Sequence, residues 1–329
     1  MSNQQGAGGL APRACAVAAA LVLIWPLASC TSPAPVRSRP QVRLTSGTPG
    51  GGFFPIGEGM ARAYATSLPF VDVHLLQSAG SISNVDAIER GDADMGLAFA
   101  DVAYIAFTGQ LDGRPARFEQ LRGMAVLELT PVHLVVRPGS DVRTVADLRG
   151  RRIALGPPGS GTGLTAKLVL KAFGVELTSL RVESIPYNQA ANRLADGTLD
   201  AMFVDGSYPL ASVRHATSVG GRLLSLGGAA IERLRHDYPF LRLTIIPGGT
   251  YPGHPAPIHT IGVETLLVCR RGLDESLVHD LTKGFFEILP LLSAQQDSLR
   301  MMDFDQAPAT PIPLHEGAAR YYRELELSR

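Results

Sequence analysis

The sequence predicts a two-lobed α/β protein, and two observations support this. Short apolar runs alternate with helical stripes along the chain, which is the pattern of a sheet covered by helices. A strand, a glycine-rich loop and a helix also occur twice in the same order, at 42–64 and 152–170. Repetition of this size indicates a duplicated architecture, with one copy in each lobe.

The glycine loops point to an anion site. The first, Gly47-Thr-Pro-Gly-Gly-Gly-Phe-Phe54, precedes a helical stripe that includes Ile56 and Met60. The second, Gly156-Pro-Pro-Gly-Ser-Gly-Thr-Gly163, precedes another that includes Leu164 and Leu168. Each loop aims free backbone N–H groups and the positive end of a helix at one point, which favours negative charge. Two such loops suggest two lobes that grip one small anionic ligand.

A second repeated motif supports the duplication. In each half a helix, a glycine turn and a strand that ends in Asp follow one another: Gly91 to Asp94 and on to Asp101, then Gly197 to Asp200 and on to Asp205. The spacing from the glycine to the inner Asp is the same in both copies.

The alternation gives the expected elements. Strands are predicted at 42–46, 71–77, 95–99, 133–137, 152–156, 181–185, 201–204, 241–246 and 263–270. Helices are predicted to begin near Pro55, Ser81, Val102, Thr144, Thr162, Gln189, Tyr208, Ala229 and Asp274, with Ser81 and Asp274 as caps.

Two extended runs, 129–137 and 261–270, are natural places for the chain to cross between lobes. The first lobe would then contain 41–132 plus 262–329, and the second 133–261. A pair of crossing segments makes a hinge. The ligand cleft would lie between the lobes, at the carboxyl ends of the strands.

Composition limits the function classes. The 329 residues include 30 Lys and Arg against 30 Asp and Glu, so the formal charge is zero. Nucleic acid is not expected as a partner, because such binding usually needs a basic excess.

The first 30 residues read as an export signal. An apolar stretch at 14–25 ends in Leu27-Ala-Ser-Cys30, which resembles a bacterial lipobox, so Cys30 would be lipidated and anchor the protein to the membrane on the periplasmic side. A plain signal peptide with an incidental cysteine is the alternative. Residues 31–40, rich in Pro and Ser, would form a tether. Cys269 then remains alone, so no intramolecular disulfide is expected.

The motifs together resemble the TAXI-type solute receptors of TRAP transporters over nearly the whole mature chain. The segments that carry the resemblance are Gly47–Gly57, Ser78–Asn84, Gly91–Gly96, Asp101–Tyr104, Val145–Ala154, Gly156–Thr162, Leu199–Phe203 and the tail Pro313–Arg323. The resemblance implies a two-lobed, type II periplasmic-binding fold. It also implies capture of a small carboxylated solute, often glutamate-like or a dicarboxylate, and its delivery to the membrane subunits of a permease.

The chain departs from the family pattern at two places. Phe99 and Ala100 stand where the family commonly has a Gln-Ser pair, and the first loop ends in Gly52-Phe53-Phe54 where Thr-Tyr-Tyr is common. Apolar surface would replace polar contacts there. We therefore expect a less polar ligand than glutamate, such as an aliphatic or aromatic carboxylate.

Each candidate contact has a plainer structural alternative. The glycines and hydroxyls of the loops could bind the ligand or only shape tight turns. Ser81, Asn84, Asp101 and Asp205 could contact the ligand or cap helices, and Phe53 and Phe54 could stack on it or pack in the core. The ligand-binding candidates are Thr48, Gly50, Gly51, Gly52, Phe53, Phe54, Ser81, Asn84, Asp101, Ser160, Gly161, Thr162, Tyr187 and Asp205.

No catalytic, cofactor or metal motif emerges from the sequence. Thr162 follows Gly161 where a P-loop needs Lys, and neither loop has the acidic residue of a dinucleotide site. His254 and His259 have no Cys or carboxylate beside them to complete a metal ligand set. We expect no cofactor, no metal and no enzymatic activity. A sensory receptor that presents its ligand to a signalling protein is the alternative function, and an exported enzyme is a further one.

Overall fold

The computed structural model describes residues 39–48, 51–114, 116–296, 299–300 and 302–328. Residues 39–329 form one compact unit. The expected signal segment, Cys30 and most of the tether lie outside the described residues. No helix in the described ranges is long and apolar enough to cross a membrane.

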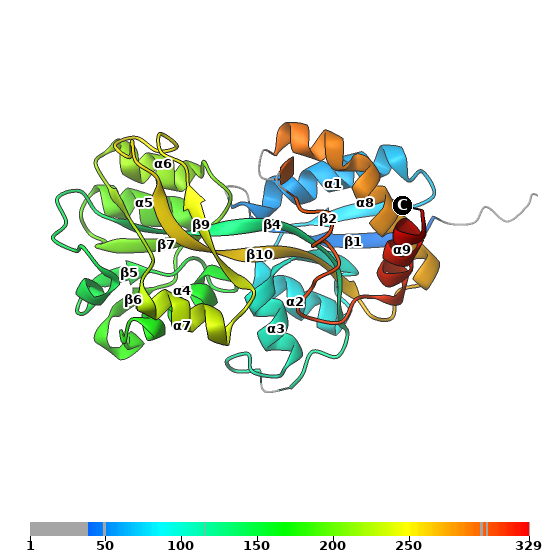
Figure 1. The fold of residues 1–329 in the computed structure, drawn as a ribbon, viewed down its shortest axis with the longest axis horizontal. Helices are drawn as coiled ribbons and strands as arrows, with labels where there is room; N and C mark the ends of the chain where they lie inside the picture. The colour runs from blue at the N-terminus through cyan, green and yellow to red at the C-terminus, as the bar shows by residue number, and fades with distance from the viewer. Residues whose placement is uncertain (1–38, 49–50, 115, 297–298, 301, 329) are drawn as a thin grey trace, which may run out of the picture. The chain divides into compact units, whose positions relative to one another are not determined.

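Helices and strands alternate along most of the chain, which confirms the α/β class (Figure 1). In chain order the elements are β1 (Gln41–Thr45), α1 (Phe53–Ser67), β2 (Asp72–Leu76), α2 (Ser81–Arg90), β3 (Met95–Phe99), α3 (Ala100–Phe107), β4 (Leu121–Val136), η1 (Val145–Leu148), β5 (Arg152–Ala154), α4 (Thr162–Ala172), η2 (Leu177–Ser179), β6 (Arg181–Glu183), α5 (Tyr187–Ala195), β7 (Ala201–Asp205), α6 (Ala211–Ser218), β8 (Arg222–Leu224), α7 (Ala229–Asp237), β9 (Leu241–Ile246), β10 (Ile258–Arg270), α8 (Glu275–Gln295) and α9 (Glu316–Leu327).

The sheet contains the same small unit twice. Its strand order is β2-β1-β3-β10-β4-β7-β5-β6, with β8 beside β4 and β9 beside β10. In the first unit β1 pairs in parallel with β2 and β3, and in the second β5 pairs in parallel with β6 and β7. Both units therefore read strand 2, strand 1, strand 3, and the antiparallel strands β10 and β4 separate them.

The inner Asp of each repeat has the same structural task. Asp94 accepts a hydrogen bond from the backbone N–H of Arg43 at 2.9 Å, and Asp200 accepts one from the backbone N–H of Arg152 at 2.9 Å. Each carboxylate thus ties the start of its strand to the neighbouring parallel strand, and an arginine side chain pairs with it. The repeat that the sequence contains is therefore a repeat of three-dimensional structure.

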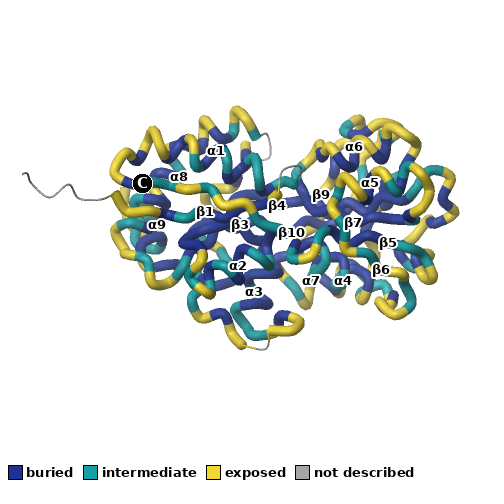
Figure 2. The backbone as a smooth tube through the Cα atoms, turned by 180° about the vertical axis from the view of Figure 1, so that it is seen from behind, coloured by how far each residue is buried: buried dark blue, intermediate teal, exposed yellow. Residues whose placement is uncertain are grey.

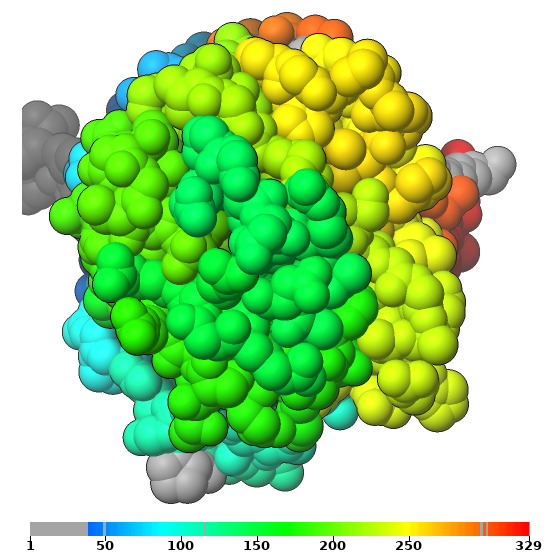
Figure 3. Space-filling model, turned by 90° about the vertical axis from the view of Figure 1, so that its left-hand side faces the viewer, coloured from blue at the N-terminus to red at the C-terminus, as the bar shows by residue number. Residues whose placement is uncertain are grey.

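Helices cover both faces of the sheet in each half (Figure 1). The strands form the buried interior, and exposure is concentrated on the outer surfaces of the helices and on the loops (Figure 2). The end of the molecule that carries α5 and β6 presents a surface made largely of the middle part of the chain, drawn in green and yellow (Figure 3).

Some local expectations need correction. Ser81 does not cap α2: Gly80 is the N-cap residue, and the Ser81 hydroxyl instead accepts a hydrogen bond from the backbone N–H of Phe99 at 3.0 Å. The helix expected near Thr144 is a single 3₁₀ turn, closed by a capping box between Thr144 and Asp147. Asp274 caps α8 as predicted, because its side chain accepts from the N–H of Leu277.

A candidate ligand-binding cavity between the glycine loops

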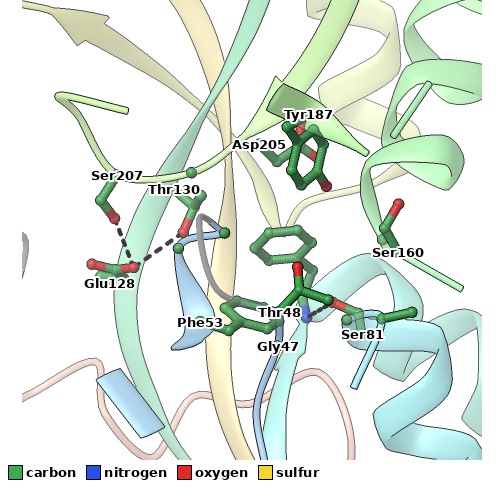
Figure 4. A pocket seen from close by; sticks show the side chains of 17 residues that line it. Gly47, Thr48, Phe53, Ser81, Glu128, Thr130, Ser160, Tyr187, Asp205 and Ser207 are labelled. Atoms are coloured by element: carbon green, nitrogen blue, oxygen red, sulfur yellow. Dashed lines mark hydrogen bonds between the residues drawn. The ribbon is translucent and has the colours of Figure 1, made fainter. Parts of the chain in front are cut away.

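A cavity lies where the two glycine loops meet. It has about 450 Å³ of atom-free space, a volume that includes the open solvent at its mouth. Both repeats contribute to its wall, as do residues of β4 (Figure 4). The lining residues are Gly47, Thr48, Gly51, Gly52, Phe53, Ala79, Gly80, Ser81, Phe99, Glu128, Thr130, Ser160, Gly161, Tyr187, Asp205, Gly206 and Ser207.

Three helix N-termini open onto this cavity. The N-cap residues of α1, α2 and α4 are Gly52, Gly80 and Gly161, and all three line the wall. None of the three caps has a side-chain hydrogen bond to the first turn. The first-turn N–H groups are therefore left to the backbone or to a ligand, and the positive ends of three helices converge on one space.

The second glycine loop lies directly against the start of α2. The carbonyl of Gly159 accepts a hydrogen bond from the N–H of Ser83 at 3.1 Å. A Cβ atom on Gly159 would lie 2.4 Å from Ser83 Oγ, and one on Gly161 would lie 2.5 Å from the Phe99 ring. The loop needs glycine at these positions because a larger residue would push the two walls apart.

Hydroxyl groups line the side of the cavity near α2 and α4 (Figure 4). Ser160 is buried, and its Oγ has no hydrogen-bond partner among the residues that the structure describes. Tyr187 shares a hydrogen bond of 2.9 Å with Thr162, whose Oγ1 also accepts from the N–H of Asp205 at 3.3 Å. Burial raises the pKa of Tyr187 to about 12, so its phenol stays neutral and able to donate.

Two carboxyl groups, those of Asp101 and Asp205, are buried near these hydroxyls. Asp101 lies behind the wall, where it accepts from the Thr165 hydroxyl at 2.8 Å and from the N–H of Val102 at 2.7 Å. Asp205 lines the cavity itself, and neither of its carboxyl oxygens has a hydrogen-bond partner among the described residues. Burial raises the pKa of Asp101 to about 6; burial and the charge of Asp101 together raise that of Asp205 to about 8.

An aromatic pair forms the apolar part of the wall. The rings of Phe53 and Phe99 meet edge to face with centroids 4.7 Å apart, and both line the cavity. Phe54 points elsewhere and lines a separate groove beside Pro209 and Gln296. The Phe99 position, where the family pattern expects a polar residue, is thus part of the cavity surface.

The structure brings most of the predicted residues together, but not all. Asn84 does not line the cavity, because its side chain bonds to Thr45, to the carbonyl of Ser46 and to the carbonyl of Leu97 inside the first repeat. Asp101, Thr162 and Phe54 are also not part of the wall. Gly50, like Cys30, lies outside the described residues.

Eight wall residues were not among the predicted contacts: Gly47, Ala79, Gly80, Phe99, Glu128, Thr130, Gly206 and Ser207. Glu128 and Thr130 project from β4, and the Glu128 carboxylate accepts hydrogen bonds from Ser207 at 2.8 Å and from Thr130 at 3.4 Å (Figure 4). The signal for this pair was that Glu128 and Thr130 are the two polar residues of the otherwise apolar run 124–132. A polar residue in a buried strand indicates a site or a hydrogen-bonded network.

Comparison with known proteins identifies the family. The NMT1-like family model matches residues 44–325, and the chain belongs to that family. Solved structures share the fold at low sequence identity. MatC from Rhodopseudomonas palustris, solved with bound malate, is 15% identical with a TM-score of 0.56, over 89% of this chain and 98% of that one.

Two further structures agree. A periplasmic transporter is 14% identical with a TM-score of 0.54, over 88% of this chain and 94% of that one. The alkanesulfonate-binding protein SsuA from Xanthomonas axonopodis pv. citri, bound to MOPS, is 17% identical with a TM-score of 0.50, over 87% and 83%. The fold is therefore that of the type II periplasmic binding proteins, as the sequence predicts.

Proposed function

We propose that this protein is an extracytoplasmic solute receptor that captures a small organic anion in the cavity between the glycine loops. The observation that carries the proposal is the convergence of the α1, α2 and α4 N-termini on one cavity, with a glycine and no side-chain cap at each. Such an arrangement favours a carboxylate or a similar group without any basic side chain. The names of the fold relatives, a malate complex and a sulfonate-binding protein among them, support the same class.

The solute we propose is amino-acid-like or a more apolar acid. The Phe53–Phe99 pair supports a more apolar acid, because it gives the cavity an apolar wall where the TAXI pattern expects polar groups. The ligand contacts that we keep from the sequence are Thr48, Gly51, Gly52, Ser81, Ser160, Gly161, Tyr187 and Asp205, together with Phe53; Glu128, Thr130 and Ser207 join them.

Capture would involve closure of two lobes, 41–132 plus 262–329 against 133–261, with β4 and β10 as the connecting strands. The closed receptor would then deliver the solute to a TRAP-type permease, and Cys30 would carry the lipid that holds the receptor at the membrane. The TAXI resemblance of the sequence supports the delivery, and the lipobox-like run that ends at Cys30 supports the lipid anchor. The receptor itself would perform no chemistry.

A thermal-shift screen tests the binding function. Protein freed of co-purified ligand by unfolding and refolding is heated with monocarboxylates, dicarboxylates, amino acids, sulfonates and aromatic acids. A ligand at about a hundred times its Kd should stabilise the folded state by roughly 2.7 kcal/mol. A hit that is lost in Gly161→Leu, which blocks the cavity, supports the proposal. No hit in any class would contradict it.

A further inference from the structure

The charges in the cavity wall are unusual for a receptor of simple anions. Its described lining residues include two carboxylates, Glu128 and Asp205, and no Lys, Arg or His. A solute with negative charge alone would lie in a confined space beside two acids and without a basic partner. Ionisation of either acid beside such a solute would be strongly unfavourable, because like charges repel at short range in a confined space. The acidic groups of the wall therefore favour a solute that carries a positively charged group.

Resting on the proposed function, we propose that the captured solute carries a protonated amino group and that Asp205 is its partner. Asp205 is the last residue of β7, a strand that is buried along its whole length, and Asp205 is 5% exposed. Both carboxyl oxygens lack a hydrogen-bond partner among the described residues although the side chain borders the cavity. A buried carboxylate in this state is costly unless a ligand completes it.

The surroundings of Asp205 leave the cavity as the direction from which a partner can come. Its own N–H binds Thr162 Oγ1, which fixes the backbone. The single hydroxyl proton of Thr165 is donated to Asp101, so it is not available to Asp205. An ammonium group is a compact donor of three hydrogen bonds and can satisfy a carboxylate from the open side.

A metal ion fits the site less well than an organic ammonium. Among the described residues no three His, Cys, Asp or Glu side chains gather in a way that could hold a metal. The helix N-termini of α2 and α4, at Gly80 and Gly161, also present positive potential to the same cavity. A zwitterion satisfies both features at once, with its acidic group toward these N-termini and its ammonium toward Asp205.

Matched pairs of ligands that differ by one amino group test the inference. Ligand-free protein is titrated calorimetrically with L-leucine and 4-methylpentanoate, L-phenylalanine and 3-phenylpropanoate, and L-glutamate and glutarate. We expect the amino member of the best-bound pair to bind at least 100-fold tighter than its partner. Equal or tighter binding of the amine-free acids would overturn the inference and leave the receptor function intact. Silence from all six and from the wider screen would overturn both.

Substitution of Asp205 tests whether its side chain contacts the ligand directly or acts only through its charge. Asp205→Asn should weaken the amino ligand at least 30-fold while the amine-free acid changes less than threefold. Asp101→Asn is the matched control, because Asp101 is also a buried carboxylate but lies behind the wall. It should change the affinity less than threefold. Equal losses in both variants, with unfolding temperatures unchanged, would contradict a direct contact, and Asp205→Glu should recover part of the affinity.

Discussion

At the scale of single residues, the described part of the cavity has one buried acid that the protein leaves without a partner. Asp205 lines the wall, with Asp101 and the Thr165 hydroxyl behind it and Tyr187 beside it. Its pKa is raised to about 8 by burial first and by the charge of Asp101 second. The free protein therefore holds this carboxyl neutral below that pH, and it must bury a second negative charge above it.

This raised pKa gives a stability prediction for the ligand-free protein. An acid whose pKa is higher in the folded than in the unfolded state contributes stability at low pH, and this contribution is lost as pH rises from about 4 through 8. Asp205→Asn should remove the dependence. Urea unfolding at pH 9 should find the variant more stable than the parent by on the order of 1–3 kcal/mol, with little difference at pH 4.5. A variant that is less stable at both pH values would contradict the assignment.

His133 in β4 gives the opposite pH dependence. Its Nδ1 faces the carbonyls of Pro131 and Val204, and its Nε2 lies 3.0 Å from the Tyr251 hydroxyl, which itself accepts from the N–H of Leu210. A neutral imidazole with hydrogen on Nδ1 satisfies every bond in this chain. Burial lowers its pKa to about 4.

The free energy of unfolding should fall as pH falls from about 6.5 to 4. Over this range the His133 imidazole is protonated in the unfolded chain but stays neutral in the folded protein. The loss should reach roughly 3 kcal/mol near pH 4. His133→Gln should flatten this part of the curve of unfolding free energy against pH. Exposed His236 is the control, and His236→Gln should follow the parent. Parallel curves for all three proteins would show that His133 is not the group responsible.

At the scale of elements, the second glycine loop lies against the start of α2, and a backbone hydrogen bond from Ser83 to Gly159 joins them. Gly159 has a φ of +84°, and Gly150, on the loop before β5, has a φ of +80°. A side chain at either position is strained, but a Cβ at Gly150 would meet nothing within 4 Å, whereas one at Gly159 would meet Ser83 and Ala79.

The two glycines therefore make a matched pair. Gly159→Ala and Gly150→Ala should each cost about 1 kcal/mol of unfolding free energy through backbone strain. Gly159→Ala should in addition weaken ligand binding tenfold or more, because it separates two walls of the cavity, while Gly150→Ala should leave the affinity within twofold. Calorimetric titration of both variants with the same ligand measures this. Equal affinities would mean that the contact between Gly159 and Ser83 does not hold the cavity closed.

The elements also mark what the sequence could and could not predict. The strands at 95–99 and 241–246 match their expected bounds, since Asp94 precedes the first and Pro247-Gly248 follow the second. The first part of β4 and the three-residue β8 were not expected, because their pairing is with strands distant in the chain and leaves no local period. The glycine loops were found from local pattern alone.

The cavity wall shows the same limit. Residues in the loops, such as Ser160 and Gly161, could be inferred because helix N-termini have a local signature. Glu128 reaches the wall only through the pairing of β4 with β10 and β7, which no local pattern specifies. Asn84 fitted the local pattern of a ligand contact, but its three hydrogen bonds go to β1, β3 and the carbonyl that follows β1.

At the scale of the whole molecule, contacts from both proposed lobes meet around the cavity. The Thr165 hydroxyl donates to Asp101, and Lys167 pairs with Asp112 at 3.0 Å. Residues of the second repeat thus hold residues of the first, and β4 and β10 are the long strands shared by both. The arrangement agrees with a closed receptor whose hinge lies in these two strands.

Closure predicts a change in size on binding. In solution the ligand-free protein should sample wider openings, because the Lys167–Asp112 ion pair that joins the two proposed lobes is solvent-exposed. Small-angle X-ray scattering should therefore give a smaller radius of gyration with ligand than without. The Thr165→Val variant, which removes the bond to Asp101, should shift the free protein toward the open form. Identical scattering curves with and without saturating ligand would rule out closure as the mechanism of capture.

The most direct test of the central claim is amide hydrogen exchange with and without the tightest ligand from the screen. If the cavity between the glycine loops captures the solute, protection should increase at the starts of α1, α2 and α4 and in 156–161. The segments at 139–150 and 248–253, which do not line the cavity, should not change. Protection confined to those turns, or to any surface away from the three helix N-termini, would contradict the account.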